Sequence, residues 1–208
     1  GESIQVSFPM LGQHQMLNAV TAVAAADALA KRGVPVASKQ IIDGLKNSRL
    51  AGRLEIMQGE VTEDGKIKGP LLVLDGAHNH ESAAALANAL KQLFHVEKCI
   101  FVVGVNSDKN ITAIWRELEP LNKYAVATKS QNARALDPTA IQDVISMFEP
   151  EHPDVCITES VPKAIDKALS IAAEGDVICV MGSLYVVAEA REYLAKHGAS
   201  KSIGTSKS

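Results

Sequence analysis

A helical pattern lies between two short apolar runs in residues 71–103, LLVLDGAHNHESAAALANALKQLFHVEKCIFVV. The runs Leu71–Leu74 and Cys99–Val105 have the length and the apolar composition of buried β-strands. Between them, Glu81–Phe94 carries apolar residues at helical intervals. A helix in this position is typical of the crossover that joins two parallel strands of one sheet. The stretch therefore predicts a strand–helix–strand unit.

The same alternation continues toward the carboxyl end. Apolar runs predict strands at Tyr124–Thr128, Val155–Thr158 and Val177–Met181. Helical patterns separate and follow them, at Ile111–Leu118, Pro138–Phe148, Val161–Ala173 and Leu184–His197. We therefore expect an α/β fold, with a doubly wound and mostly parallel sheet covered by helices on both faces.

Ligands of such sheets bind beyond the carboxyl ends of the strands, where crossovers to opposite faces open a crevice. The loops that follow the predicted strands are therefore the candidates for chemistry. All four are polar or contain glycine: Asp75–His80, Gly104–Asn110, Lys129–Leu136 and Gly182–Tyr185.

The first fifty residues have a different pattern. Gln15–Arg32 is an alanine-rich helical stretch, and Ser38–Lys46 predicts a second helix with Ser38 as its N-cap. Because two helices cannot form a core alone, we interpret residues 1–50 as the tail of a preceding domain and residues 51–198 as the α/β domain. The remaining predictions are a strand at Arg53–Gln58 and a hairpin or exposed loop at Gly59–Gly69, with a turn at Glu63-Asp64-Gly65. A disordered tail is predicted at 199–208.

Composition argues against several classes of function. The 208 residues carry a formal net charge of -3, and the 21 Lys and Arg residues are scattered, which argues against a nucleic-acid partner. The apolar runs fall short of the ~20 residues of a membrane-spanning helix, so no membrane association is expected. Cys99, Cys156 and Cys179 are widely spaced in predicted strands. We interpret them as reduced core thiols of a cytoplasmic protein, and no Cys or His pair has the spacing of a metal site.

Four short motifs occur in a fixed order along the chain. They are Leu11-Gly12-Gln13-His14-Gln15-Met16-Leu17-Asn18-Ala19, Gly52-Arg53-Leu54-Glu55, Asp75-Gly76-Ala77-His78-Asn79 and Gly182-Ser183-Leu184-Tyr185. Together they resemble the pattern of the folylpolyglutamate/dihydrofolate synthases, a branch of the Mur ligase superfamily. The resemblance extends from Leu11 to Arg191.

The resemblance implies a Rossmann-like Mur ligase C-terminal domain, preceded by two helices from the central ATP-binding domain. It also implies an ATP-dependent ligase that phosphorylates a folate carboxylate and lets the amine of glutamate attack the acyl phosphate. In this family ATP and Mg²⁺ bind between the central and C-terminal domains. The implied partners are ATP, L-glutamate and a folate or dihydropteroate, in a monomeric cytoplasmic enzyme.

By the same resemblance, Asn18, Arg53 and Asp75 would contact ATP. His78 and Ser183 would handle the incoming glutamate, with His78 as the candidate catalytic residue. Arginine offers planar, charged donors that suit phosphate oxygens or stack on a base. An aspartate at the end of a strand can accept from ribose hydroxyls or from an adenine amino group.

Each candidate also has a purely structural interpretation. Arg53 could pair with Glu55 or a nearby acid, and Asp75 could cap the helix that begins near Glu81. Asn18 could face solvent, His78 could pack against its surroundings, and Ser183 could N-cap the last helix.

Weaker matches and one absence complete the comparison of motifs. Asp108-Lys109-Asn110 is similar to the family's Asp-Lys-Asp loop, Arg134 matches a family arginine approximately, and His80 stands where the family usually has proline. The 208 residues contain no Gly-x-x-x-x-Gly-Lys-Ser/Thr P-loop and no recognisable magnesium ligands. We therefore expect an inactive carboxyl-terminal portion of a longer enzyme, with Mg²⁺ held mainly by the other domain.

Three alternatives stay open. A peptidoglycan-building Mur ligase would tend to carry Tyr in place of Gly76 and would lack the Gly-Ser-Leu-Tyr motif. A Rossmann domain that binds a nicotinamide dinucleotide would need Gly-x-Gly-x-x-Gly where this chain has Asp75–Asn79. A noncatalytic domain could keep the fold without the activity.

Overall fold

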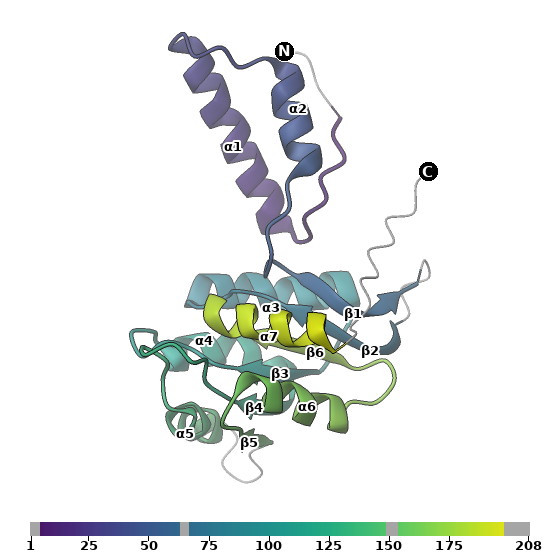
Figure 1. Cartoon of the computed structure of the whole chain (residues 1–208), viewed down its shortest axis with the longest axis vertical. Coiled ribbons are helices and arrows are strands. Elements are labelled where there is room, and N and C mark those ends of the chain that lie inside the picture. Colours follow the sequence, from purple (N-terminus) through teal and green to yellow (C-terminus); the bar gives the residue numbers. More distant parts are fainter. Residues whose placement is uncertain (1–4, 63–66, 149–153, 198–208) are drawn as a thin grey trace.

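The computed structural model describes residues 5–62, 67–148 and 154–197 (Figure 1). These residues form a six-stranded sheet with the order β1-β2-β6-β3-β4-β5. Strand β1 is antiparallel to β2 at one edge, and the other neighbouring strands run parallel. The strands are β1 Glu55–Val61, β2 Ile67–Leu74, β3 Cys99–Val103, β4 Asn122–Ala127, β5 Val155–Ile157 and β6 Val177–Met181. The predicted mostly parallel α/β sheet is confirmed.

Helices cover both faces of the sheet. One hydrophobic cluster holds α3 (His80–Phe94), α4 (Ile111–Leu118) and α5 (Pro138–Phe148) against the first face. A second cluster holds α6 (Val161–Ile171) and α7 (Leu184–Lys196) against the other face. Strand β3 contributes to both, since successive side chains of a strand point to opposite faces. The sheet is therefore doubly wound, as the sequence predicts.

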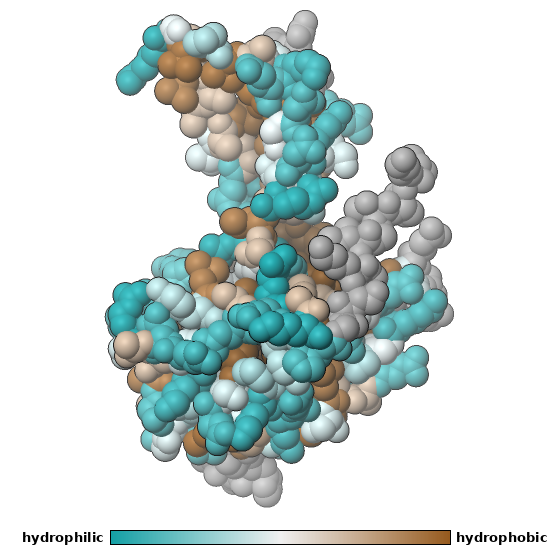
Figure 2. Space-filling model, viewed as in Figure 1, coloured by the Kyte–Doolittle hydropathy of each residue, from teal (hydrophilic) through white to brown (hydrophobic). Residues whose placement is uncertain are grey.

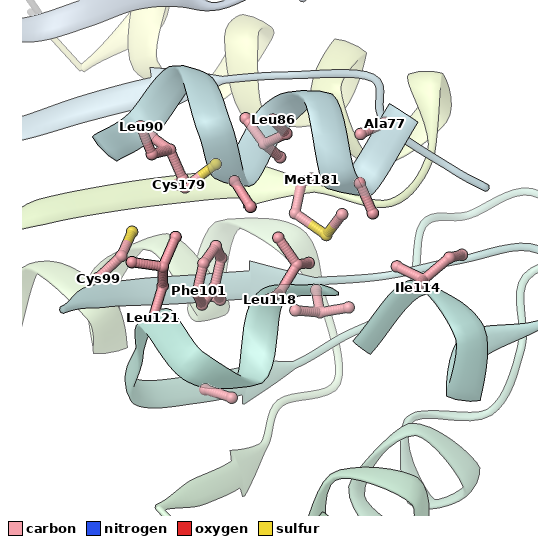
Figure 3. Packing of buried hydrophobic residues seen from close by; sticks show 14 of the residues in the cluster. Ala77, Leu86, Leu90, Cys99, Phe101, Ile114, Leu118, Leu121, Cys179 and Met181 are labelled. Atoms are coloured by element: carbon pink, nitrogen blue, oxygen red, sulfur yellow. The ribbon is translucent and has the colours of Figure 1, made fainter. Parts of the chain in front are cut away.

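The first cluster forms the larger part of the core (Figure 3). Leu86 and Leu90 of α3, with Ile114 and Leu118 of α4, lie against strands β3 and β6. The ring of Trp115 in α4 meets that of Phe101 edge-on, with centroids 5.8 Å apart. Every residue of β3 and β6 is buried. This burial on both faces explains why the two strands are apolar throughout rather than alternating.

Strand β6 is the last in the sequence and yet lies near the middle of the sheet. It pairs with β2 on one side and with β3 on the other. The crossover through α3 therefore leaves one position between β2 and β3, and the chain returns through α6 to fill it. As a result, the loops that follow β2 and β6 are neighbours.

Helices α1 (Gln13–Lys31) and α2 (Ser38–Asn47) form a pair that projects from the α/β domain (Figure 1). Gln15 is the one buried residue of α1. Figure 2 shows hydrophobic surface on the pair, and its large exposed apolar residues include Met16, Leu17, Val20, Leu29 and Val34. A patch of this kind is typical of an interaction surface. No helix in the described ranges has the length and apolarity needed to cross a membrane.

The prediction that Ser38 caps α2 is wrong. Ala37 is the N-cap residue, and Ser38 is the first residue of the helix. The amide of Ala37 donates to Oε1 of Gln40 at 2.8 Å. The side chain of Gln40 reaches back to the start of the helix, and the helix begins without a hydroxyl cap.

The other boundaries agree with the predictions to within a few residues, with one extension. The hairpin predicted within Gly59–Gly69 is present, since β1 pairs with β2 through Glu60 with Lys68 and Val61 with Ile67. Strand β2 begins at Ile67 rather than Leu71 because this pairing extends it at the edge of the sheet. The predicted turn at 63–65 and the predicted tail at 199–208 lie outside the described residues.

Candidate active site

The loops after β2 and β6 meet at the carboxyl edge of the sheet. The two strands are in parallel register up to Leu74 and Val180, and the amide of Asp75 donates to the carbonyl of Val180 at 3.0 Å. The chain then turns from β2 into α3 and from β6 into α7, which cover opposite faces. Such a divergence opens the crevice where doubly wound sheets bind ligands. Asp75 and Ser183 thus flank a topological switch point.

Asp75 is a buried carboxylate fixed by two backbone amides. Asp75 is only 5% exposed. Oδ2 accepts a hydrogen bond from the amide of Leu54 at 2.9 Å, and Oδ1 accepts one from the amide of Ala77 at 2.8 Å. Burial raises the pKa of Asp75, while these two bonds and the charges of Arg53 and His14 oppose the rise. The carboxylate therefore joins the end of β2 to the loop before β1.

The loop Gly52–Leu54 has a conformation that ordinary residues rarely adopt. Gly52 has φ +69° and Leu54 has φ +49°. A Cβ on Gly52 would lie 2.5 Å from Cγ1 of Val187, so only glycine fits this approach to α7. The carbonyl of Gly52 accepts from the amide of Gly76 at 2.8 Å. The loop is thus tied to the segment that carries Asp75.

Glu55 braces the same loop from the other side. Its Oε2 accepts from the amide of Gly52 at 2.9 Å, and its Oε1 accepts from Nε of Arg191 at the same distance. The ion pair of Glu55 is therefore with α7 and not with Arg53. The part of the structural interpretation that paired Arg53 with Glu55 is wrong.

Arg53 lies beside the backbone of Gly76. A Cβ on Gly76 would lie 3.3 Å from Nη1 of Arg53 and 2.5 Å from Cδ2 of Leu184. Within the described residues, no ion pair within 4.0 Å joins the half-buried Arg53, although its charge acts on Asp75. The guanidinium therefore stands at the crevice with donors to offer a ligand.

His78 has a defined ring orientation. Its Nδ1 lies 2.7 Å from the carbonyl of Gly76. Because a carbonyl only accepts, Nδ1 carries a proton and donates, and Nε2 is left as the acceptor of the neutral ring. The amide of His78 donates to Oγ of Ser82 at 3.0 Å. The ring is thus held by the turn that leads into α3.

The cap of α3 is Asn79 and not Asp75. Oδ1 of Asn79 accepts from the amide of Ser82 at 2.8 Å, in the position of an N-cap residue. The carboxylate of Asp75 is occupied by the amides of Leu54 and Ala77 instead. The structural interpretation of Asp75 as a helix cap is therefore wrong.

Ser183 caps the last helix, as its structural interpretation states. The residue is 4% exposed, and its Oγ accepts from the amide of Tyr185 at 3.2 Å. An accepting hydroxyl keeps its own proton to donate. Its predicted contact with substrate stays a prediction.

Asn18 is not brought to the other candidates by any described contact. It is exposed on α1, and its Nδ2 donates to Oε1 of Gln15 at 3.2 Å. His14, four residues earlier in the same motif, acts electrostatically on Asp75, as Arg53 also does. Sequence reasoning missed His14, although it was part of the quoted motif.

The weaker matches lie on two loops that close on each other. The amide of Ser107 donates to the carbonyl of Arg134 at 2.8 Å, and Lys109 pairs with Asp108 at 2.8 Å. Asn110 caps α4 by accepting from the amide of Ala113 at 3.0 Å. An asparagine in place of the family's acid therefore has a helix-capping role here.

His80 stands beside α4. Its Nδ1 lies 3.3 Å from Oε1 of Glu117. This residue takes the place of the family's proline at the first position of α3, where proline is also favoured. The helix begins normally with histidine there.

Other features of the described surface lie away from these motifs. A depression of about 460 Å³ opens at the amino ends of the strands, lined by residues such as Phe94, Lys98 and Glu174, and none of the four motifs lines it. In residues 5–62, 67–148 and 154–197, no group of three or more His, Cys, Asp or Glu side chains could hold a metal ion.

Comparison with known proteins identifies the family. A family model described as "Mur ligase, glutamate ligase domain" matches residues 52–184, a range that contains Arg53, Asp75, His78 and Ser183. The chain belongs to the Mur ligase family. This confirms the resemblance that the four motifs indicate.

Several relatives of this chain carry the names of folate enzymes, and one is named as a UDP-N-acetylmuramyl-tripeptide synthetase. The chain is 34% identical over 191 residues to a probable bifunctional folylpolyglutamate synthase/dihydropteroate synthase of Haloferax volcanii, covering 91% of this chain and 21% of that protein. It is 31% identical over 205 residues to the dihydrofolate synthase/folylpolyglutamate synthase of Mycobacterium tuberculosis, covering 89% and 39%.

A solved structure also matches. The folylpolyglutamate synthase of Mycobacterium tuberculosis complexed with ADP and AMPPCP aligns with a TM-score of 0.77 and 29% identity, over 91% of this chain and 42% of that one. The chain thus spans well under half the length of these relatives.

Proposed function

We propose that the protein functions as an ATP-dependent ligase that adds glutamate to a folate. The observation that carries this proposal is the position of Arg53 and Asp75 together at the switch point between β2 and β6, in a chain of the Mur ligase family. These 208 residues are proposed to supply one wall of the site. A second domain of the whole protein is proposed to supply the P-loop, and the 208 residues alone are proposed to be inactive.

Arg53 is proposed to bind the nucleotide. Its guanidinium has no ion-pair partner within the described residues. Because Gly76 has no side chain, the guanidinium can lie close to the backbone there. A planar charged group of this kind suits phosphate oxygens or the face of a base. It would offset the negative charge that develops during phosphoryl transfer.

Asp75 is proposed to contact the nucleotide mainly through the loops that it holds. Each of its oxygens already accepts from one backbone amide, and each keeps a second lone pair. Because the residue is only 5% exposed, a ribose hydroxyl or an adenine amino group can reach no more than one edge of the carboxylate. Its larger contribution is to fix the backbone beside Arg53.

His78 and Ser183 are proposed to handle the incoming glutamate. In the reaction, the amine nitrogen attacks the carbonyl carbon of the acyl phosphate, the bond to the phosphate oxygen breaks, and the nitrogen loses a proton. Nε2 of His78 is the ring atom left to accept that proton, because Nδ1 donates to the carbonyl of Gly76. The hydroxyl proton of Ser183 can donate to a carboxylate of glutamate.

The remaining partners belong to the same proposal. Asn18 is proposed to reach ATP once the second domain lies against α1. Mg²⁺ is proposed to accompany ATP and to take its ligands mainly from that second domain. Folate and dihydropteroate are both proposed as acceptors, in a monomeric cytoplasmic enzyme.

The experiment measures ATP-dependent incorporation of labelled glutamate into folate or dihydropteroate by the full-length gene product. Arg53→Ala is expected to raise the ATP concentration required for half-maximal rate by roughly tenfold or more, about 1.4 kcal/mol of binding free energy. Arg116→Ala, which removes an exposed arginine from α4, serves as the matched control and should leave it unchanged. Incorporation only into a UDP-muramyl acceptor, or an unchanged ATP requirement in Arg53→Ala, would contradict the proposal.

A further inference from the structure

His14 lies where the helical pair meets the α/β domain. It is the second residue of α1, at the end of that helix nearest to the sheet (Figure 1). It is half-buried, unlike most of α1, whose surface is largely exposed. The position of this ring therefore affects how the helical pair is seated.

The ring packs against the tight turn at Gly12, and this turn lies beside the loop that carries Arg53. Gly12 has φ +96°, and a Cβ there would lie 2.7 Å from Cε1 of His14 and 3.0 Å from Cδ1 of Leu54. Gly12 thus lies close to both the imidazole of His14 and the side chain of Leu54. Only a glycine at position 12 leaves room for this arrangement.

Helix α3 forms the third side of the junction. A groove of about 190 Å³ is lined by His14 and Leu17 of α1 together with Ala85, Asn88 and Gln92 of α3. His14 of α1 therefore lies near both α3 and the turn at Gly12 that meets Leu54.

The junction is directly connected to Asp75. Leu54, which contacts the junction through its side chain, donates its amide to Oδ2 of Asp75 at 2.9 Å. The positive form of His14 also lowers the pKa of Asp75, in the same direction as Arg53 and against the effect of burial. The junction is thus linked to the carboxylate through the Leu54 amide and through charge.

We propose that His14 is a positioning residue that couples the docking of the helical pair to the arrangement of Arg53 and Asp75. The ring holds the turn at Gly12 against the side chain of Leu54, and this packing keeps the Leu54 amide on the carboxylate of Asp75. The part of the proposal that concerns ATP rests on the proposed function. The part that concerns the backbone does not.

The test is amide hydrogen exchange of the full-length protein without nucleotide. His14→Ala is expected to speed exchange of the Leu54 and Ala77 amides by about tenfold, while the amides of β3 keep their protection. His14→Gln, which keeps a planar polar side chain of similar reach, should restore most of that protection. His95→Asn removes an exposed histidine at the amino ends of the strands and serves as control, because asparagine tolerates the left-handed backbone at that position.

Equal exchange at Leu54 and Ala77 in wild type and His14→Ala would overturn the coupling. So would faster exchange across β3 as well, because a general loss of stability would then explain the change. ATP titration is a separate readout, in which His14→Ala should raise the half-saturating ATP concentration several-fold without lowering the maximal rate. If the wild type does not use ATP, the proposed function fails, and the exchange data still decide the role of His14.

Discussion

The backbone amide of Leu54 donates a hydrogen bond to Oδ2 of Asp75 at 2.9 Å, across 21 positions of the sequence. This bond joins the loop before the edge strand β1 to the end of β2, beside Arg53. Leu54 has a positive φ and is buried, so the bond helps to hold a backbone conformation that leucine rarely adopts. The candidate site therefore depends on one buried carboxylate for its backbone geometry.

Asp75→Asn tests the cost of burying that carboxylate. Burial raises the pKa of Asp75 above its usual value of about 3.9. The folded state therefore holds the proton more tightly, and the stability contributed by the protonated group is fully present below pH about 3.9 and is lost as pH rises through the folded pKa. In urea titrations, the stability of wild type relative to Asp75→Asn should fall over that window and then level off.

Other acids contribute stability that rises with pH, and comparing wild type with Asp75→Asn cancels this contribution. Asp108 and Asp137 have lowered pKa values, mainly through hydrogen bonds with Lys109 and Thr139, and both are present in each protein. A stability difference that rises with pH instead would contradict a raised pKa for Asp75.

Gly52→Ala tests the approach of the Arg53 loop to α7. The substitution places a Cβ 2.5 Å from Val187 at a φ of +69°, and should destabilise the protein by about 1–3 kcal/mol. Gly44→Ala is the matched control, because Gly44 lies within α2 with open space around it. That change should stabilise by about 0.5–1 kcal/mol. Thermal unfolding followed by circular dichroism measures both, and equal effects would argue against the clash.

Thr128→Val should stabilise the protein. Thr128 is fully buried after β4, and no hydrogen-bond partner of its hydroxyl occurs within the described ranges. Replacing the hydroxyl with a methyl group of similar size removes the cost of burying it, about 1 kcal/mol. Thr139→Val is the control of opposite sign, because the exposed Thr139 hydroxyl bonds to Asp137. Chemical denaturation gives both values, and a destabilised Thr128→Val protein would indicate a partner for the hydroxyl.

Thiol titration should distinguish the three cysteines. Cys99 and Cys179 are fully buried in β3 and β6, and burial raises the pKa of both. Cys156 lies half-buried on the edge strand β5. A thiol reagent should therefore modify one thiol per chain in the native protein and three after unfolding. Rapid modification of two or three thiols without unfolding would contradict this burial.

Much of the fold could be predicted because its strands are buried on both faces. Cys99–Val103 and Val177–Met181 are apolar throughout, and this run length distinguishes them from the helices between them. The order of the strands could not be predicted in the same way, because the insertion of β6 between β2 and β3 depends on contacts between distant parts of the chain. The start of β2 was missed for a similar reason, since only its pairing with β1 extends it to Ile67.

The candidate site was predictable in part. Arg53, Asp75 and Ser183 follow from the motifs and from the rule that ligands bind at the carboxyl ends of strands. The partners of these residues could not be predicted. The sequence does not show whether Glu55 pairs with Arg53 or with Arg191, and in the structure it pairs with Arg191 of α7. The proximity of His14 to Asp75 was hidden as well, since it arises from the way α1 lies against the Leu54 loop. The hydroxyl cap expected at Ser38 failed because Gln40 satisfies the Ala37 amide.

The central position of β6 also determines when the domain can be completed during synthesis on a ribosome. Until residues 177–181 emerge, β2 and β3 have an empty place between them, and the amide of Asp75 has no Val180 carbonyl to meet. A nascent chain that stops before Val177 therefore leaves two unjoined halves of the sheet with exposed apolar edges. The crevice between Asp75 and Ser183 is among the last features of the molecule to form.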